Sequence, residues 1–140
     1  MPVFLVLALF GAFVIGGCAA PAPAPAANGV AGPWRIEQAR SEPLLDRRQA
    51  RLDFGADGRL AGHTSCNTLR ATYTLVGDAL KIGPIATTRM ACAQRELEQE
   101  DRVLTALELA RTARVRSDGL LELRDEDGRG VLRATRLPSD

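Results

Sequence analysis

Apolar and polar positions alternate along most of the chain from about residue 33 onward, and this two-residue period predicts short, half-buried β-strands. Turn-forming pairs such as Asp57-Gly58 and Gly77-Asp78 separate the alternating segments, as in β-hairpins. The segments with this pattern are 33–37, 50–54, 59–62, 71–75, 80–82, 112–116, 120–124 and 130–137. Short strands joined by frequent turns are typical of a small, mostly antiparallel barrel or sandwich. The only tryptophan, Trp34, lies in the first segment and is predicted to be a core anchor.

A single segment, residues 94–110, has the period of a helix. Its apolar stripe consists of Leu97, Val103, Leu104, Leu107 and Ala110. Acidic residues crowd the first half of the segment and Arg111 follows its end, which matches the helix dipole. We interpret the acidic cluster as a solvated face and not as a metal or acid–base site. The fold class is therefore mainly β with one helix, which covers an open end or edge.

The first residues predict that the protein is exported and attached to a membrane. Val3–Ile15 is an unbroken apolar run of 13 residues, which as a helix would reach only about 20 Å, less than the roughly 30 Å of a bilayer core. Residues 1–17 are therefore predicted to be a signal peptide. Ile15-Gly16-Gly17-Cys18 resembles a bacterial lipobox, so we expect Cys18 to be acylated and to anchor the protein firmly. Ala19 is not the aspartate associated with inner-membrane retention, and by this resemblance we expect the outer membrane, facing the periplasm.

Residues 18–32 are rich in Ala, Pro and Gly, a composition that favours an extended spacer. The folded domain is accordingly expected at 33–137. The chain has 18 basic and 17 acidic residues, and opposite signs alternate along it. This balance argues against a nucleic-acid partner, which requires a one-sided basic face.

Two cysteines remain after Cys18 is assigned to the anchor. In an oxidising compartment, Cys66 and Cys92 are predicted to form a disulfide, which would be worth roughly 3 to 4 kcal/mol. A thiol nucleophile beside His63 is a weaker interpretation, because residues three apart on a strand point to opposite faces. A zinc site would lack a fourth ligand at motif spacing. No metal or cofactor is expected.

The order of several motifs resembles one known family, the META domain of HslJ-like heat-shock lipoproteins. The residues that carry the resemblance are Trp34, Phe54, Gly58, Leu60, Gly62, Cys66-Asn67, Tyr73, Leu80, Ile82 and the run Ala86-Thr87-Thr88-Arg89-Met90-Ala91-Cys92. The commonest form of the first motif has a glycine where this chain has Ser65. The resemblance implies a small lipocalin-like barrel in the envelope, an association with stress and secretion, and no assigned reaction.

Three hypotheses on function follow. The leading one is a non-enzymatic, lipid-anchored envelope protein that acts as a monomeric binding or interaction module linked to envelope integrity or stress tolerance, with an envelope protein as its partner. The alternatives are a carrier that holds a small ligand inside the barrel and, least favoured, a thiol-dependent enzyme. Most motif residues are predicted to be framework. The candidate interaction residues are Asn67, Thr87, Thr88 and Arg89.

Overall fold

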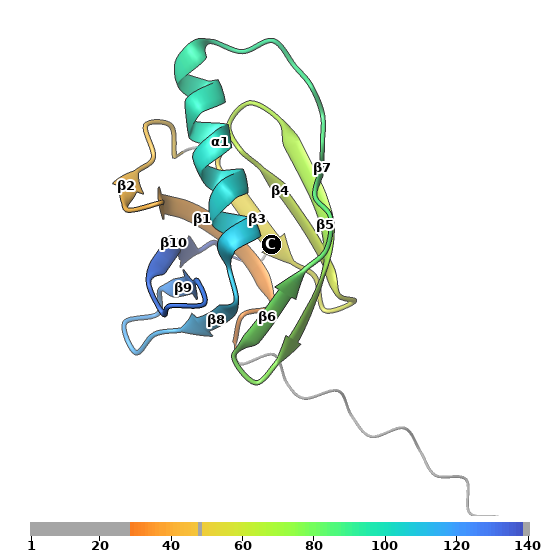
Figure 1. Cartoon of the computed structure of the whole chain (residues 1–140), viewed down its shortest axis with the longest axis vertical. Coiled ribbons are helices and arrows are strands. Elements are labelled where there is room, and N and C mark those ends of the chain that lie inside the picture. The colour runs from red at the N-terminus through yellow and green to blue at the C-terminus, as the bar shows by residue number, and fades with distance from the viewer. Residues whose placement is uncertain (1–28, 48, 139–140) are drawn as a thin grey trace, which may run out of the picture.

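The computed structural model describes residues 29–47 and 49–138, which form an antiparallel barrel with one helix (Figure 1). The strands and the helix are β1 (Gly32–Ala39), β2 (Glu42–Pro43), β3 (Arg51–Phe54), β4 (Arg59–His63), β5 (Thr68–Val76), β6 (Ala79–Ile82), β7 (Ala86–Thr87), α1 (Gln94–Leu109), β8 (Thr112–Val115), β9 (Leu121–Arg124) and β10 (Gly130–Arg136).

Eight of these strands close the barrel in the order β1, β3, β4, β5, β6, β8, β9 and β10. Closure depends on β10, which pairs with β9 on one side and with β1 on the other. The short β2 pairs with the end of β1, and β7 pairs with β5. The prediction of a mainly β fold with one helix is confirmed, and pairing of the first and last strands decides for a closed barrel over a sandwich.

The inside of the barrel is filled by large apolar side chains. Trp34 is fully buried, as predicted for a core anchor, and its indole Nε1 donates a hydrogen bond to the carbonyl of Val30 at 2.7 Å. The rings of Phe54 and Tyr73 meet edge to face, with centroids 5.1 Å apart. Other side chains with almost no exposure are Ile36, Leu52, Leu60, Leu69, Leu107, Leu121, Leu123 and Leu132.

The packed region includes residues that were predicted to belong to the spacer. Val30 has no exposed surface, and it accepts the hydrogen bond from Trp34. An apolar side chain within the Ala/Pro-rich stretch thus lies in the core, a few residues before the predicted start at residue 33. The predicted signal peptide and Cys18 lie outside the described residues. Within the described part of the chain, no helix is long and apolar enough to cross a membrane.

Helix α1 packs over β1 and β10 (Figure 1), and its buried face differs from the predicted stripe. Leu97 is 39% exposed, whereas Gln99 is 1% exposed beside Val103 and Leu107. The physical reason is that the first half of α1 faces loop backbone, which needs polar partners, and only its second half faces the apolar core.

Candidate functional site

The turn from β4 to β5 and the first half of α1 meet in a polar cluster, which we define as Thr64, Ser65, Asn67, Gln99 and Glu100. These five residues come from two regions more than thirty positions apart in the chain, and side-chain hydrogen bonds join the two regions. Thr64, Asn67 and Gln99 have almost no exposed surface. The cluster contains the Cys-Asn motif that the sequence analysis singled out.

The backbone of the turn is shaped by Ser65, whose φ of 81° lies in the left-handed region. Glycine adopts this conformation without steric cost, which gives a reason for the glycine that is common in the resembling family. Here the serine side chain adds contacts of its own. Its Oγ donates to the carbonyl of Asp46 at 2.9 Å and accepts from Gln99 Nε2 at 3.1 Å. Its backbone N–H donates to His63 Nδ1 at 3.0 Å.

Asn67 uses both ends of its amide. The Nδ2 group donates to Glu100 Oε1 at 3.1 Å, while Oδ1 accepts from the backbone N–H of Met90 at 2.8 Å and from the hydroxyl of Thr88 at 2.9 Å. One buried side chain therefore ties the β4–β5 turn to the helix and to the segment after β7.

Thr64 and Gln99 complete the cluster. The hydroxyl of Thr64 donates to Glu100 Oε2 at 2.6 Å, and it accepts from the backbone N–H of Asn67 at 3.0 Å. Gln99 Oε1 accepts from the backbone N–H groups of Leu45 and Asp46, at 2.8 and 3.1 Å. Gln99 thus ties the backbone of the loop before β3 to the first half of α1.

Cys66 and Cys92 are joined in a disulfide, as expected, at a sequence separation of 26. Cys66 is only 4% exposed. The bond fixes the segment after β7 to the β4–β5 turn, beside the hydrogen bonds of Asn67. Both thiols are consumed by the bond, which removes the nucleophile that the thiol-enzyme hypothesis needs in this state.

The structure brings together three of the four candidate interaction residues and leaves the fourth outside. Asn67 and Thr88 are hydrogen-bonded to each other, and half-buried Thr87 pairs with Leu69 in the ladder between β5 and β7. Arg89 is exposed and makes no hydrogen bond or ion pair with any described residue. Met90 beside it is 64% exposed. Of the motif side chains, Arg89 and Met90 are thus available to a partner.

Two members of the cluster escaped prediction. The burial of Gln99 could have been predicted, because Gln99 lies four positions before Val103 on the stripe that the helix buries. A glutamine at such a position predicts a buried partner for its amide. Glu100 was assigned to a solvated acidic face, and this was wrong, because Glu100 accepts from Thr64 and Asn67. Among the described residues, no group of three or more His, Cys, Asp and Glu side chains is placed to hold a metal ion.

The fold and the cluster define a class of protein, a small closed antiparallel barrel of lipocalin-like type with a disulfide-linked turn under one helix. The family model of the META domain matches residues 27–137, and the chain therefore belongs to the META domain family. No curated protein matches the chain.

Solved structures share this fold. A protein from Burkholderia xenovorans, determined by NMR, is 25% identical with a TM-score of 0.61, over 93% of this chain and all of that one. A second NMR structure is 22% identical with a TM-score of 0.55, over 74% of this chain and 87% of the other. A DUF4847 family protein from Bacteroides vulgatus is 16% identical with a TM-score of 0.58, over 79% of this chain and 95% of that one.

Proposed function

We propose that this chain is a lipid-anchored protein of the bacterial envelope, and that its META barrel is a non-enzymatic interaction module that supports envelope integrity or stress tolerance. Acylated Cys18 would hold the protein on the outer membrane, facing the periplasm. The partner would be an envelope protein that presents a carboxylate within an apolar surface. The observation that supports this role is the exposure of Arg89 and Met90 on a segment whose backbone is held in place.

Residues 88–93, which we call the 88–93 loop, are held at three points. The backbone N–H of Thr88 donates to the carbonyl of Thr68 at 3.1 Å, that of Met90 donates to Asn67 Oδ1, and Cys92 is bonded to Cys66. A loop that is ordered before it binds loses less conformational entropy on association. Arginine and methionine are also enriched at protein interfaces. These features favour a docking role for the 88–93 loop over a purely structural one.

The carrier hypothesis receives less support. The barrel interior is occupied by Trp34, Phe54 and a set of leucines with almost no exposure. A small ligand would have to displace these side chains, and their close packing stabilises the domain.

The anchor can be tested by metabolic labelling with a palmitate analogue and by membrane fractionation. Wild-type protein should carry the label and sediment with the outer membrane. Cys18→Ser should lose the label and appear in the soluble fraction. An unlabelled wild-type protein would contradict the anchor without bearing on the 88–93 loop.

The interaction can be tested in a strain that lacks this protein and is challenged with detergent. Wild-type protein should restore growth, while Arg89→Ala and Met90→Ala should restore it less although their unfolding temperatures are unchanged. Arg51→Ala is the matched control, because Arg51 is also exposed and its side chain has no partner among the described residues. A photo-reactive residue at position 90 should crosslink to one envelope protein. Full rescue by both loop variants, together with unchanged crosslinks, would refute the role of the 88–93 loop.

A further inference from the structure

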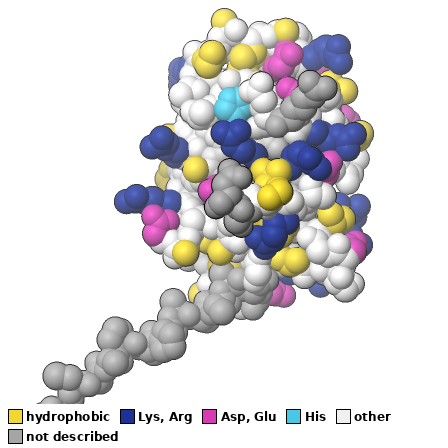
Figure 2. Space-filling view, turned by 180° about the vertical axis from the view of Figure 1, so that it is seen from behind, with side chains coloured by type: hydrophobic (Ala, Val, Ile, Leu, Met, Phe, Trp, Pro, Cys, Tyr) yellow, Lys and Arg dark blue, Asp and Glu magenta, His cyan; other side chains and the backbone are white. Residues whose placement is uncertain are grey.

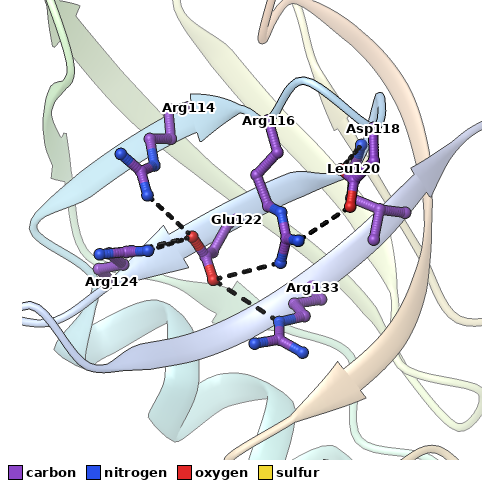
Figure 3. Close-up of polar contacts among 7 residues, drawn as sticks. All are labelled: Arg114, Arg116, Asp118, Leu120, Glu122, Arg124 and Arg133. Carbon is purple, nitrogen blue, oxygen red and sulfur yellow. Dashed lines mark hydrogen bonds and ion pairs between the residues drawn. The ribbon is translucent and has the colours of Figure 1, made fainter.

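Four arginines converge on one carboxylate on the outside of the barrel (Figure 3). The strand register explains why they meet. Glu122 of β9 lies directly opposite Arg114 of β8 and directly opposite Arg133 of β10. Arg124 lies two positions after Glu122 on β9, and Arg116 lies two positions after Arg114, directly after the end of β8, so both share the outward face. We call these four arginines and Glu122 the arginine cluster.

The carboxylate at the centre is almost fully buried, with 3% of its side chain exposed. Burial alone would raise the pKa of Glu122, but the nearby guanidinium groups of Arg124, Arg116 and Arg133 hold that pKa below its usual range. Glu122 is therefore ionised at neutral pH. It acts as an internal anion that holds the surrounding arginines close to one another.

Glu122 satisfies these arginines unequally. Arg124 has two nitrogens at 2.9 and 2.8 Å from Oε2, and Arg114 Nη2 lies 3.5 Å from the same oxygen. Arg116 Nη1 and Arg133 Nε are 3.9 and 3.6 Å from Oε1, beyond the usual hydrogen-bond distance. Each guanidinium has five N–H donors, so most donors of Arg116 and Arg133 are not used by Glu122.

The arginine cluster also has more positive than negative charge. Within the described part of the chain, Asp118 is the acidic residue besides Glu122 that pairs with these arginines, and it lies 2.9 Å from Arg116. Four positive charges thus meet two negative ones. On the face seen in Figure 2, basic side chains are spread out and several lie beside acidic ones. The arginine cluster is a local excess of positive charge in a chain whose net charge is only +1.

The four arginines line a hollow of about 540 Å³, together with Val115, Ser117 and Glu122. The arginine side chains remain 34–46% exposed, so a ligand can reach them. A planar guanidinium pairs with oxyanions through two parallel N–H bonds. The hollow therefore combines an accessible volume, oriented donors and unbalanced positive charge.

We propose that the hollow of the arginine cluster is a binding site for a phosphate group, with Arg116 and Arg133 as the main donors. A phosphate monoester has a charge of about −1.5 to −2 and three accepting oxygens, which match the two unbalanced charges and the several free donors better than a carboxylate does. The group can belong to a soluble phosphate ester or to a lipid headgroup. Glu122 and Arg124 form the base of the site and position the other arginines.

The test is calorimetric titration of the full chain, in an uncharged detergent and at constant ionic strength, with sodium phosphate and with sodium acetate. Phosphate should bind more tightly than acetate, and the backbone amide NMR signals of β8, β9 and β10 should shift. Arg116→Gln and Arg133→Gln should each weaken phosphate binding by roughly tenfold or more, because each removes a charge-assisted hydrogen bond to the phosphate. Arg133→Lys, which keeps the charge but loses the planar fork, should recover only part of the affinity.

Arg70→Gln is the matched control, because Arg70 is exposed on β5 and its side chain has no partner among the described residues. It should bind phosphate as wild type does. Short-chain phosphatidic acid distinguishes the sources of the phosphate group: tighter binding than inorganic phosphate indicates a lipid headgroup, and equal or weaker binding indicates a soluble ester. Equal binding of phosphate and acetate, or unchanged affinity in the folded Arg116→Gln and Arg133→Gln variants, would overturn the proposal.

Discussion

Asn67→Ala is the most direct test of the polar cluster as framework. The substitution removes the hydrogen bond that Asn67 donates to the carboxylate of Glu100. It also removes the two hydrogen bonds that Asn67 accepts from the neutral donors of Met90 and Thr88. The first is worth about 1.5 to 3 kcal/mol and the others about 1 kcal/mol each. Because Thr88 and Met90 lie at the surface, water replaces part of the loss, and we expect a net cost of about 2–4 kcal/mol. This is a large share of the 5 to 15 kcal/mol typical of a domain.

The measurement is equilibrium unfolding in urea under non-reducing conditions. With a slope of about 1.5 kcal/mol per molar urea, a loss of about 3 kcal/mol lowers the midpoint by about 2 M. Thr74→Ala on β5 is the control, because Thr74 is exposed and its side chain has no partner among the described residues. It should change stability by less than about 0.5 kcal/mol.

A double-mutant cycle isolates the bond between Asn67 and Glu100. If both side chains act through their shared hydrogen bond, Glu100→Gln combined with Asn67→Ala should cost less than the sum of the single variants, by about 1 kcal/mol. An Asn67→Ala protein as stable as the Thr74→Ala control would refute the reasoning, and would mean that the buried amide contributes nothing net to the fold.

Three further predictions concern the Cys66–Cys92 disulfide, the close backbone contact at Gly62 and the dependence of stability on acid pH. Replacing Cys66 and Cys92 by alanine should lower the free energy of unfolding by about 3.5 kcal/mol, as expected for a loop of this length; an unchanged urea midpoint would contradict it. Gly62→Ala should cost about 1–3 kcal/mol in the same assay, because its Cβ would lie 2.6 Å from the carbonyl oxygen of Arg51, and a neutral effect would show that the strands separate freely there. Because the pKa of Glu122 is lowered in the folded state, its contribution to stability is fully present above the unfolded pKa of about 4.3 and is lost as pH falls through the folded value. The stability gap between wild type and Glu122→Gln should therefore shrink from about pH 6 to about pH 3, and a constant gap across this range would contradict the lowered pKa.

The sequence motifs located the polar cluster but did not reveal how it works. Cys66 and Asn67 were singled out by the motif, and Cys92 followed from the count of cysteines. The role of Gln99 could have been suspected from its position on the buried stripe of α1. The partner of Asn67 could not, because Glu100 looks like one more acidic residue on a charged helix until the β4–β5 turn is placed beside it.

The arginine cluster was missed for a different reason. Alternating signs along the chain suggested a well-mixed surface, and that inference treats sequence neighbours as spatial neighbours. On a strand, residues two apart share a face, and the closest side chains belong to the strands on either side. Arg114, Glu122 and Arg133 lie opposite one another only because β8, β9 and β10 pair in their observed register.

The sequence by itself determined the local features of this protein. The two-residue period set the strands, the Asp-Gly and Gly-Asp pairs set the turns, and the single helical segment set α1, because each of these depends on neighbours within a few positions. The tertiary structure alone decided that β10 returns to β1, that Glu100 is the partner of Asn67, and that four arginines surround Glu122. These outcomes depend on which distant residues share a burial site or a strand register, and local patterns of neighbouring residues do not reveal that.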